Sequence, residues 1–321
     1  MIDTILHIKN LKTHLTTPSG TVQAVDGIDL AIAANETLGL VGESGCGKSM
    51  TALSILRLYP KPQGKIVQGQ ILFMGEDLAK KTEEEMYHIR GKKISMIFQE
   101  PMTSLDPVFP IGREIIEVLT IHQNLSYPEA KKQAVDLLKK VRIPEPEKRF
   151  WEYPHQMSGG MRQRVMIAMA LACHPALLLA DEPTTALDVT IQAQILSLIN
   201  DLKKEFQTAV LLITHDLGIV AETCQRVAVM YAGKIVEKAD VYSLFSNTLH
   251  PYTRSLLNAI PRLRGTQQRL ESIPGRVPNL SAPPSGCRFH PRCSRQIPVC
   301  ISTEPEFKEK NKDHWVACHL Y

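Results

Sequence analysis

The pattern of apolar and polar residues predicts strands in the first quarter of the chain. Three short segments alternate apolar with polar side chains, which is the period of a half-buried strand: residues 5–11, 22–32 and 71–73. Residues 37–41 (TLGLV) are mostly apolar, as in a strand that is buried on both faces. This strand leads into a Gly-rich turn, after which we expect a helix over residues 48–58 that ends before Pro60.

The middle of the chain predicts a helical insertion followed by a parallel sheet. Apolar positions recur with helical spacing between about residues 113 and 171. Strand signals then return in three segments: residues 176–180, 209–214 and 227–231. A helical stretch at residues 189–205 separates the first two, and this βαβ order implies parallel strands. We expect the sheet to end near Asp240.

The last part of the chain has a different composition. From His250 to Tyr321 it is rich in Pro, Arg and Cys and has weak periodicity. We therefore expect a small appended domain that needs a bound metal or a cross-link to stabilise its fold. The predicted organisation is one domain over residues 1–249, with a helical subdomain at about 101–172, and an extension over residues 250–321.

Length and charge exclude several classes of protein. With 321 residues, 44% of them apolar, the chain fits roughly two domains of about 150 residues each. A net charge of +4, from 37 Lys and Arg against 33 Asp and Glu, is too balanced for a dedicated nucleic-acid binder. The longest apolar stretch, residues 165–180, is shorter than the ~20 residues of a membrane span. The first residues (MIDTILHIKNLK) do not read as an export signal, so we expect a cytoplasmic protein.

A phosphate-binding motif follows the buried strand. Residues 42–49 read GESGCGKS, a complete G-x-x-x-x-G-K-S between a predicted strand and a predicted helix. The glycines let backbone N–H groups turn toward phosphate oxygens, Lys48 should reach the β- and γ-phosphates, and Ser49 should ligate Mg²⁺. The alternative is a Gly-rich turn without a ligand. The residues expected to bind a nucleotide here are Gly42, Ser44, Gly45, Cys46, Gly47, Lys48, Ser49 and Met50.

Two acidic residues end the predicted strand at residues 176–180. Asp181 stands where a carboxylate can hold the Mg²⁺ shell, and Glu182 stands where it can polarise an attacking water. Taken alone, two adjacent acids also suit a solvated turn. Together with the phosphate-binding motif, they predict a nucleotide-hydrolysing site.

These motifs in combination resemble the ABC ATPases. The segments that carry the resemblance are the GESGCGKS loop, MSGGMRQR at 157–164, ALLLADEPTTALD at 176–188 and ITHD at 213–216. The resemblance implies an α/β fold of the ABC-type P-loop ATPases. Such a fold has a RecA-like parallel-sheet core, an N-terminal antiparallel β subdomain and an α-helical subdomain, with a small Cys-rich C-terminal domain in this chain.

The resemblance assigns a second phosphate-contacting segment. Ser158, Gly159 and Gly160 would belong to the signature loop, which contacts the γ-phosphate held by the P-loop of the opposite subunit, so that one chain cannot complete a site. The usual signature is LSGGQ, whereas this chain has Met157 and Met161. Because the serine and the glycines are kept, we expect the binding geometry to survive.

Further roles follow from the same resemblance. Gln99 resembles the Q-loop residue, near Mg²⁺ and the attacking water and facing the transporter's membrane subunit. His215 resembles the switch histidine, which would bond the γ-phosphate and hold Glu182 and the water in register. Asp188 resembles the D-loop acid that communicates across the dimer.

The adenine site departs from the family. Many relatives place an aromatic residue in the N-terminal strand region, whereas this chain has none before Tyr59. We expect Leu15 or His14 to pack against the base instead, with weaker base discrimination.

The resemblance extends to the ATPase subunits of oligopeptide and dipeptide importers and covers nearly the whole chain. The segments that carry it are IFQEPMTSLDP, MSGGMRQRVMIAMAL, HPYTRSLLNAIP, IPGRVPNL and CRFHPRC. Such importers pair two different ATPase subunits with two membrane subunits and an extracellular peptide-binding protein. The resemblance therefore implies an ATP-hydrolysing subunit on the cytoplasmic face of the membrane that drives peptide uptake. Import of nickel or another small solute is the alternative, and a non-transport ABC ATPase acting on DNA or ribosomes is a more distant one.

Four of the seven cysteines cluster in the tail: Cys287, Cys293, Cys300 and Cys318. In a reducing compartment, clustered cysteines indicate a metal before disulfides, but separations of five, six and seventeen residues do not select which metal. The resemblance implies a [4Fe–4S] cluster held by these four cysteines. Zinc and unliganded thiols are the alternatives, and His290, His314 and His319 leave a mixed Cys/His site open. We expect Arg288 and Arg292 to be solvated surface charges, and the alternative is that they hydrogen-bond near the cluster sulfurs.

Overall fold

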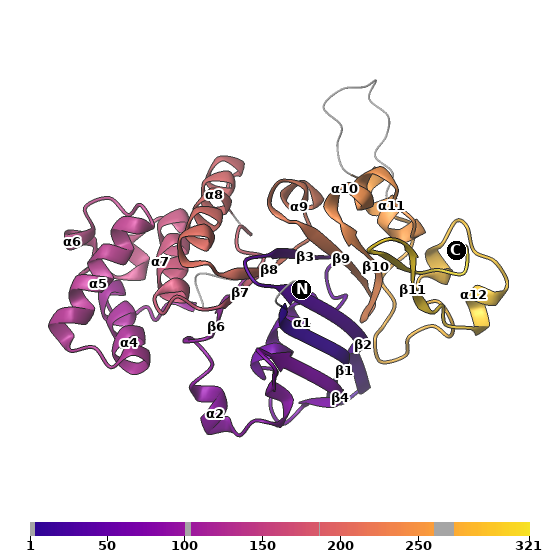
Figure 1. Cartoon of the computed structure of the whole chain (residues 1–321), viewed down its shortest axis with the longest axis horizontal. Coiled ribbons are helices and arrows are strands. Elements are labelled where there is room, and N and C mark those ends of the chain that lie inside the picture. Colours follow the sequence, from indigo (N-terminus) through magenta and orange to yellow (C-terminus); the bar gives the residue numbers. More distant parts are fainter. Residues whose placement is uncertain (1–3, 100–103, 186, 260–272) are drawn as a thin grey trace. The chain divides into compact units, whose positions relative to one another are not determined.

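The computed structural model describes residues 4–99, 104–185, 187–259 and 273–321 of the chain (Figure 1). The chain forms two compact units. Unit 1 consists mainly of Ala33–Glu36 and Lys80–Leu212. Unit 2 consists of Leu6–Ile32, Thr37–Ala79 and Ile213–Tyr321. Unit 2 therefore gathers segments from the two ends of the sequence.

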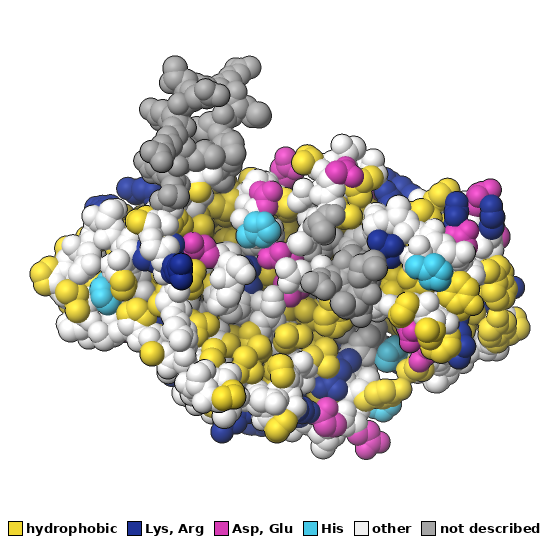
Figure 2. Space-filling model, turned by 180° about the vertical axis from the view of Figure 1, so that it is seen from behind, with side chains coloured by type: hydrophobic (Ala, Val, Ile, Leu, Met, Phe, Trp, Pro, Cys, Tyr) yellow, Lys and Arg dark blue, Asp and Glu magenta, His cyan; other side chains and the backbone are white. Residues whose placement is uncertain are grey.

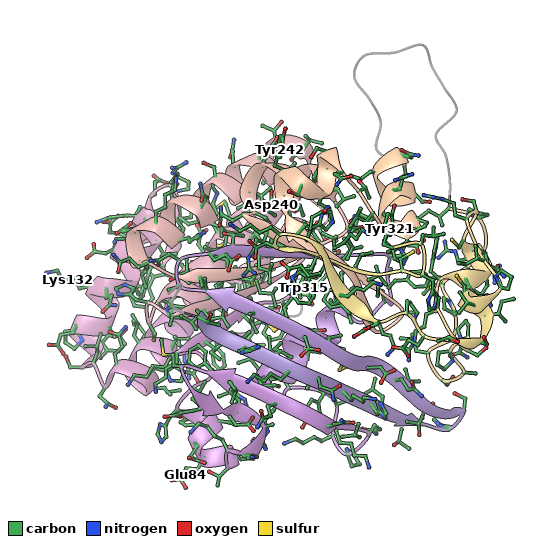
Figure 3. The ribbon with its side chains drawn as sticks, turned by 45° about the vertical axis from the view of Figure 1, so that its right-hand side comes forward. Glu84, Lys132, Asp240, Tyr242, Trp315 and Tyr321 are labelled. Carbon is green, nitrogen blue, oxygen red and sulfur yellow. The ribbon has the colours of Figure 1, made fainter. Side chains whose placement is uncertain are left out.

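An antiparallel sheet is formed by the N-terminal strands of unit 2 (Figures 1 and 3). In spatial order its strands are β2 (Gly20–Ala33), β1 (Thr4–Thr17), β4 (Gly64–Phe73) and β5 (Glu76–Asp77). Leu6 and Ile8 of β1 are fully buried, and His7 between them is half-buried, as the alternating pattern predicts. The predicted strands of this region are confirmed, and each is longer than the pattern indicated.

The second sheet of unit 2 contains the buried strand β3 (Thr37–Val41). Beside it, in spatial order, lie β9 (Arg226–Tyr231), β10 (Lys234–Asp240), β12 (His314–Ala317) and β11 (Phe307–Asn311). β3 and β9 are parallel, whereas β9 and β10 form a hairpin. Ala232 and Gly233 turn this hairpin with φ angles of 46° and 85°, the left-handed values that a tight hairpin turn requires.

The expectation that the sheet ends near Asp240 is wrong, because the C-terminal hairpin continues it. β12 pairs with β10 in antiparallel register, with Val316 opposite Glu237 and Trp315 opposite Lys238. The Lys238 ammonium lies 5.1 Å from the Trp315 ring centroid, and Trp315 is labelled in Figure 3. The two strands have only five and four residues, and a polar turn separates them, so their alternation is too short to read from sequence.

Helices pack around these strands in unit 2. They are α1 (Lys48–Leu56), α9 (Leu217–Thr223), α10 (Val241–Ser246), α11 (Pro251–Asn258) and α12 (Val299–Ser302), with short 3₁₀ turns at Leu78–Lys80 and His290–Arg292. The helix expected over residues 48–58 is confirmed as α1, and its last turn ends at Arg57 in a left-handed conformation.

Unit 1 contains parallel strands and six of the described α-helices. β6 (Ile94–Ile97) pairs in parallel with β7 (Leu177–Asp181), and β8 (Ala209–Thr214) follows β7 in the sheet. The helices are α2 (Glu83–Tyr87), α4 (Ile111–Gln123), α5 (Tyr127–Lys140), α6 (Pro146–Arg149), α7 (Gly159–Leu171) and α8 (Val189–Phe206), with a 3₁₀ turn at Pro154–Gln156. The expected order of strand, helix and strand is confirmed, since α8 connects β7 to β8.

The surface carries both signs of charge. On the face drawn in Figure 2, Lys and Arg side chains are interspersed with Asp and Glu, which agrees with the small net charge. Within the described ranges, no helix combines the length and the apolar character that a membrane span needs.

Candidate functional site

The loop between β3 and α1 has a backbone that requires glycine. Gly42 and Gly47 have φ angles of 155° and 111°. A Cβ atom on Gly42 would lie 2.2 Å from the carbonyl oxygen of Met230, and one on Gly47 would lie 2.3 Å from that of Ala24. These distances leave no room for a side chain, so the two glycines let the loop fold against β9 and β2.

The folded loop presents backbone donors at the start of α1. The first N–H groups of any helix have no acceptor within the helix, and the N-cap residue Gly47 has no side chain to satisfy them. Lys48 is buried, and its Nζ donates to the carbonyl oxygens of Gly42 at 2.8 Å and Glu43 at 3.1 Å. Ser49 is half-buried in the first turn of the helix. This arrangement of N–H groups, one lysine and one hydroxyl suits an anionic phosphate.

The other residues of the motif are placed around the same loop. Ser44 and Gly45 are exposed at its tip, and Met50 is half-buried in α1. Cys46 is fully buried, and burial raises the pKa of its thiol, which therefore stays protonated at neutral pH.

The two acidic residues follow β7 in unit 1. All five residues of β7 are buried, and Asp181 at its end is 4% exposed. Glu182 leaves the strand in a left-handed conformation with φ of 46°. Its Oε2 accepts hydrogen bonds from Gln99 Nε2 at 3.2 Å and from Thr185 Oγ1 at 2.9 Å. The structure thus brings together Gln99 and Glu182, which are 83 positions apart in sequence.

The SGG segment begins helix α7. Ser158 is the N-cap, and its Oγ accepts a hydrogen bond from the Met161 N–H at 3.3 Å. A Cβ on Gly160 would lie 2.9 Å from Ile191 of α8, so the two helices approach closely at this point. Met157, which stands where the usual signature has leucine, is buried as an apolar side chain.

A glutamine links this helix to the acidic loop. Gln163 of α7 is buried, and its Nε2 donates to the carbonyl oxygen of Pro183 at 2.6 Å. Because Pro183 directly follows Glu182, this hydrogen bond connects α7 to the loop that carries the acidic residue. No motif in the sequence singles out Gln163.

Asp188 and His215 lie at the starts of two other helices. Asp188 is the N-cap of α8, and its carboxylate accepts the Ile191 N–H at 3.0 Å. His215 is exposed between the end of β8 and Asp216, the N-cap of α9. Asp216 accepts the N–H groups of Gly218 and Ile219 at 2.7 and 3.3 Å, which fixes the start of the helix next to the histidine.

The candidate residues divide between the two units. The P-loop and His215 belong to unit 2, whereas Gln99, Asp181, Glu182, the SGG segment and Asp188 belong to unit 1. Some residues of the motifs lie outside the described part of the chain: 100–103 of IFQEPMTSLDP, Ala186 of ALLLADEPTTALD, and 260 and 261 of HPYTRSLLNAIP.

The residues expected at the adenine lie on β1. His14 and Leu15 are half-buried, and they stand opposite Lys65 and Gly64 of β4. A Cβ on Gly64 would lie 3.0 Å from both Leu15 Cδ2 and a ring carbon of Tyr59. Packing of either residue against adenine stays a prediction.

The four cysteines of the tail are neighbours in unit 2. Burial, together with the other three thiols, raises the pKa of Cys287 to about 11, and the Cys287 N–H donates to the carbonyl oxygen of Cys300 at 2.9 Å. Burial also raises the pKa values of Cys293 and Cys318. Cysteine sulfur is the donor that iron–sulfur clusters and zinc take, but these raised pKa values keep the thiols protonated at neutral pH when no metal is bound. Among the described residues, however, no three His, Cys, Asp or Glu side chains are arranged as a metal-ligand set.

The three nearby histidines each engage a ring nitrogen elsewhere. His314 Nε2 lies 2.8 Å from Glu237 Oε1, and both side chains are buried. His290 Nδ1 lies 2.9 Å from the carbonyl oxygen of Cys287, and His319 Nε2 lies 2.8 Å from that of Thr303. These bonds limit a mixed Cys/His site to the remaining nitrogen of each ring.

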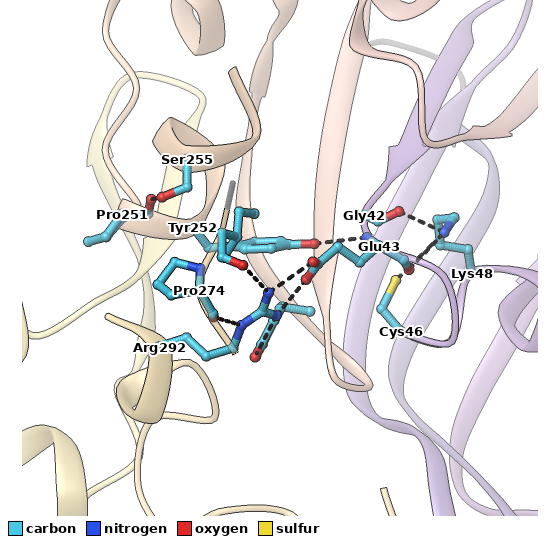
Figure 4. A network of polar contacts seen from close by, with 11 residues as sticks. Gly42, Glu43, Cys46, Lys48, Pro251, Tyr252, Ser255, Pro274 and Arg292 are labelled. Atoms are coloured by element: carbon cyan, nitrogen blue, oxygen red, sulfur yellow. Dashed lines mark hydrogen bonds and ion pairs between the residues drawn. The ribbon is translucent and has the colours of Figure 1, made fainter. Parts of the chain in front are cut away.

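The expectation that Arg288 and Arg292 are solvated is wrong, because both are buried and paired. Arg288 is 7% exposed and forms an ion pair with Asp26 and a hydrogen bond with the Ala232 carbonyl. Arg292 is 9% exposed and contacts both carboxylate oxygens of Glu43, at 2.7 and 3.0 Å (Figure 4). The acidic partners lie about 250 positions earlier in sequence, so the tail alone could not reveal them.

Comparison with known proteins gives concordant matches. Residues 25–185 match the family described as ABC transporter, and residues 236–300 match that described as oligopeptide/dipeptide transporter, C-terminal region. A probable peptide ABC transporter ATP-binding protein of Sinorhizobium fredii is 55% identical over 98% of this chain and 95% of its own length. The oligopeptide transport ATP-binding protein AppD of Bacillus subtilis is 51% identical over 100% of this chain and 98% of its own.

A similar solved structure is the dimeric, post-hydrolysis ATP-binding cassette MJ0796 bound to ADP and Pi. It superposes with a TM-score of 0.66 at 27% sequence identity, and covers 74% of this chain and 98% of that one. A second, the protein cbiO1 of Clostridium perfringens, part of the ABC transporter complex cbiONQ, has a TM-score of 0.64 at 26% identity. It covers 76% of this chain and 92% of its own.

Proposed function

The chain belongs to the ABC transporter family, and on that premise we propose that it is the ATP-binding and ATP-hydrolysing subunit of a peptide importer. The observation that carries the proposal is the presence, in one chain, of a P-loop with the required backbone geometry and a C-terminal region of the oligopeptide/dipeptide transporter type. The relatives named for oligopeptide or dipeptide transport align over nearly the full length of this chain.

We assign nucleotide binding to the P-loop and to the first turn of α1. The N–H groups of residues 44–50 would cradle the phosphates, and Lys48 would exchange the carbonyl oxygens of Gly42 and Glu43 for the β- and γ-phosphates. Ser49, Asp181 and Gln99 would hold Mg²⁺, which when bound supplies positive charge opposite the phosphate oxygens. Buried Asp181 is a carboxylate of the kind that this cation selects.

We assign the attack on the γ-phosphate to a water polarised by Glu182. The carboxylate already accepts hydrogen bonds from Gln99 and Thr185, which orient it, and one further lone pair suffices to accept a proton from water. His215, exposed at the end of β8, would bond the γ-phosphate and keep Glu182 and the water in register.

We assign Ser158, Gly159, Gly160 and Asp188 to contacts with a second ATPase subunit. The exposed start of α7 would approach the γ-phosphate bound by the partner's P-loop, so that two subunits complete each site. The solved cassette MJ0796 is dimeric, which supports this arrangement. The partner would be a different ATPase chain, and the pair would act on two membrane subunits that receive peptide from an extracellular binding protein.

We place the subunit peripherally on the cytoplasmic face of the membrane. In this proposal residues 1–249 form the ATPase domain, with a helical subdomain at about 101–172, and residues 250–321 form the extension that marks the peptide importers. Residues 236–300 match the C-terminal region of the oligopeptide/dipeptide transporter family. This match supports peptide as the cargo rather than nickel or another small solute.

Complementation tests the cargo. A strain that lacks this chain should regain uptake of a labelled di- or oligopeptide when the chain is supplied, and should not regain it with Lys48→Ala. Nickel uptake should not change in either case. Restored uptake of nickel without restored uptake of peptide would overturn the peptide assignment and leave the ATPase assignment intact.

For the tail we propose a thiolate-held metal centre, a [4Fe–4S] cluster at Cys287, Cys293, Cys300 and Cys318. The kind and number of donors support it, because cysteine thiolates are the usual ligands of such clusters and the extension supplies four cysteines, which the structure does not arrange as a ligand set. Iron, acid-labile sulfide and zinc should be measured per chain after anaerobic purification. About four iron and four sulfide would support the cluster. One zinc without sulfide would replace it with a structural zinc site, and the absence of all three would reject a metal.

A further inference from the structure

The C-terminal extension contacts the nucleotide loop directly. Arg292 NH1 lies 2.7 Å from Glu43 Oε2 and its NH2 lies 3.0 Å from Glu43 Oε1, a bidentate pair between the tail and the second residue of the P-loop (Figure 4). Both residues belong to unit 2. The Arg292 side chain is 5% exposed and that of Glu43 is 27% exposed, so water screens this pair less than an ion pair at the open surface.

The guanidinium of Arg292 is fixed on its other sides. Its Nε donates to the Pro274 carbonyl at 2.8 Å, and its carbon lies 5.8 Å from the Tyr231 ring centroid. The bond to Glu43 raises the pKa of Arg292 above its ordinary value, so the residue is a permanent cation. A guanidinium held on several sides can in turn hold the carboxylate in one place.

A second contact from the extension reaches the backbone of the same residue. The N–H of Glu43 donates to the hydroxyl of Tyr252 at 2.8 Å. Tyr252 is fully buried on α11, and its ring packs against Tyr231 and Phe289 at centroid distances of 4.6 and 5.3 Å. Burial raises the pKa of the Tyr252 hydroxyl, so it remains protonated.

The start of α11 explains how Tyr252 reaches the loop. His250 is the N-cap, and its Nδ1 accepts the Tyr252 N–H at 3.0 Å. Pro251 occupies the first helical turn, where its fixed φ suits a helix. The consecutive residues of HPY therefore provide a cap, a helix start and a hydroxyl directed at the P-loop.

Glu43 is also the residue on which the P-loop folds back. Its carbonyl oxygen accepts the Cys46 N–H at 3.3 Å and the Lys48 ammonium at 3.1 Å. Contacts that fix its side chain and its N–H therefore also fix the carbonyl that orients Lys48. Preorganised groups bind a ligand more tightly because less ordering remains to be done on binding.

We propose that Arg292 and Tyr252 are positioning residues of the ATP site, which act through Glu43 to hold the P-loop and Lys48 ready for the phosphates. The extension is in this respect a working part of the nucleotide site. This inference rests on the proposed function, because it assigns further residues to the same ATP site.

The structure offers a matched control for the test. Arg288 is as buried as Arg292 and also joins the extension to the rest of unit 2, but its acidic partner is Asp26 of β2 and not the P-loop. Arg292→Gln and Arg288→Gln each remove one buried cation from the tail. A merely structural role predicts the same outcome for both.

The experiment compares the full-length chain and its variants by their Kd for Mg·ATP, and by the KM and kcat of ATP hydrolysis after assembly with the partner ATPase and membrane subunits. Arg292→Gln should weaken Mg·ATP binding about tenfold and raise KM to match, with kcat changed less than about twofold. Arg292→Lys should recover part of the affinity, whereas Arg288→Gln should bind Mg·ATP within about twofold of the unaltered chain. Equal affinity in the two glutamine variants would overturn the inference.

Two further variants cover the case in which Arg292→Gln does not fold. Glu43→Gln removes the same ion pair from the other side, and Tyr252→Phe removes only the hydroxyl. Both should weaken Mg·ATP binding, and unchanged affinity in both would overturn the inference. The unaltered chain tests the proposed function separately, because its failure to bind Mg·ATP would reject that function and not only the role of Arg292.

Discussion

The guanidinium of Arg292, 29 residues before Tyr321, contacts both carboxylate oxygens of Glu43 in the P-loop. This pair joins the segment that identifies the peptide-importer group to the loop that all P-loop ATPases share. The loop proposed to bind phosphate is therefore held by a residue from the C-terminal extension.

Alanine at two P-loop glycines should distinguish the cost of a steric clash from the cost of a strained φ angle. In Gly42→Ala the new Cβ would lie 2.2 Å from the Met230 carbonyl oxygen, so the loop must move, and Mg·ATP affinity should fall by at least about tenfold. Gly45→Ala is the control, because its φ is also positive but nothing lies within 4 Å of the new Cβ. That variant should lose only about 1 kcal/mol of stability. Calorimetric titration and thermal unfolding measure both effects, and equal losses in the two variants would contradict this account.

The loop of the candidate site could be predicted because the residues that form it are adjacent in sequence. The GESGCGKS loop, its preceding strand and its following helix are contiguous, so their order alone indicated the phosphate cradle. The contact of Gln99 with Glu182 is not local. The family resemblance places Gln99 near the attacking water but does not predict its bond to Glu182, which forms because β6 and β7 pair in parallel.

The predictions that are wrong concern the tail, because its side chains and strands contact residues that are distant in sequence. Arg288 and Arg292 lie in a Pro- and Cys-rich stretch without periodicity, and nothing nearby indicated that Asp26 and Glu43 would bury them. The hairpin of β11 and β12 was missed for a similar reason. Its strands are short and carry several charges, and the pairing of β12 with β10 defines them more than their own composition does.

The buried pair of Glu237 and His314 should contribute strongly to stability. Glu237 is fully buried, and it contacts the His314 ring and also accepts the N–H groups of Leu249 and His250, at 2.8 and 3.0 Å. Glu237→Ala leaves all three groups without this acceptor and should lower the free energy of unfolding by about 3–5 kcal/mol.

A surface ion pair provides the comparison for that variant. Asp201 lies 3.0 Å from Arg142, and both side chains are more than half exposed. Asp201→Ala should therefore cost less than about 1 kcal/mol when this variant and Glu237→Ala are both unfolded in urea. Similar losses for Glu237→Ala and Asp201→Ala would contradict the proposed importance of the buried pair.

Acid should destabilise the chain through His250. Burial lowers the pKa of His250 to about 4, well below the value of about 6.5 in an unfolded chain. The unfolded state therefore binds the proton more readily. The stabilising contribution is complete above pH 6.5 and is lost as the pH falls toward 4.

The conservative variant His250→Asn isolates this contribution, since asparagine can cap α11 without titrating. Between pH 6.5 and 4, the free energy of unfolding of the unaltered chain should fall faster than that of the variant, by up to about 1.4 kcal/mol per pH unit. Parallel pH profiles from urea unfolding would show that His250 does not titrate in this range.

The most direct test of the central claim is phosphate release by the chain assembled with its partner ATPase and membrane subunits, with Glu182→Gln as the altered form. Glutamine keeps an oxygen that can accept the bonds from Gln99 and Thr185 but cannot act as a base. We predict steady ATP hydrolysis by the unaltered assembly. In the variant we predict the same Mg·ATP affinity with a turnover reduced at least about a hundredfold. Undiminished turnover in Glu182→Gln would contradict the role of Glu182, and the absence of ATP hydrolysis by the unaltered assembly would contradict the function itself.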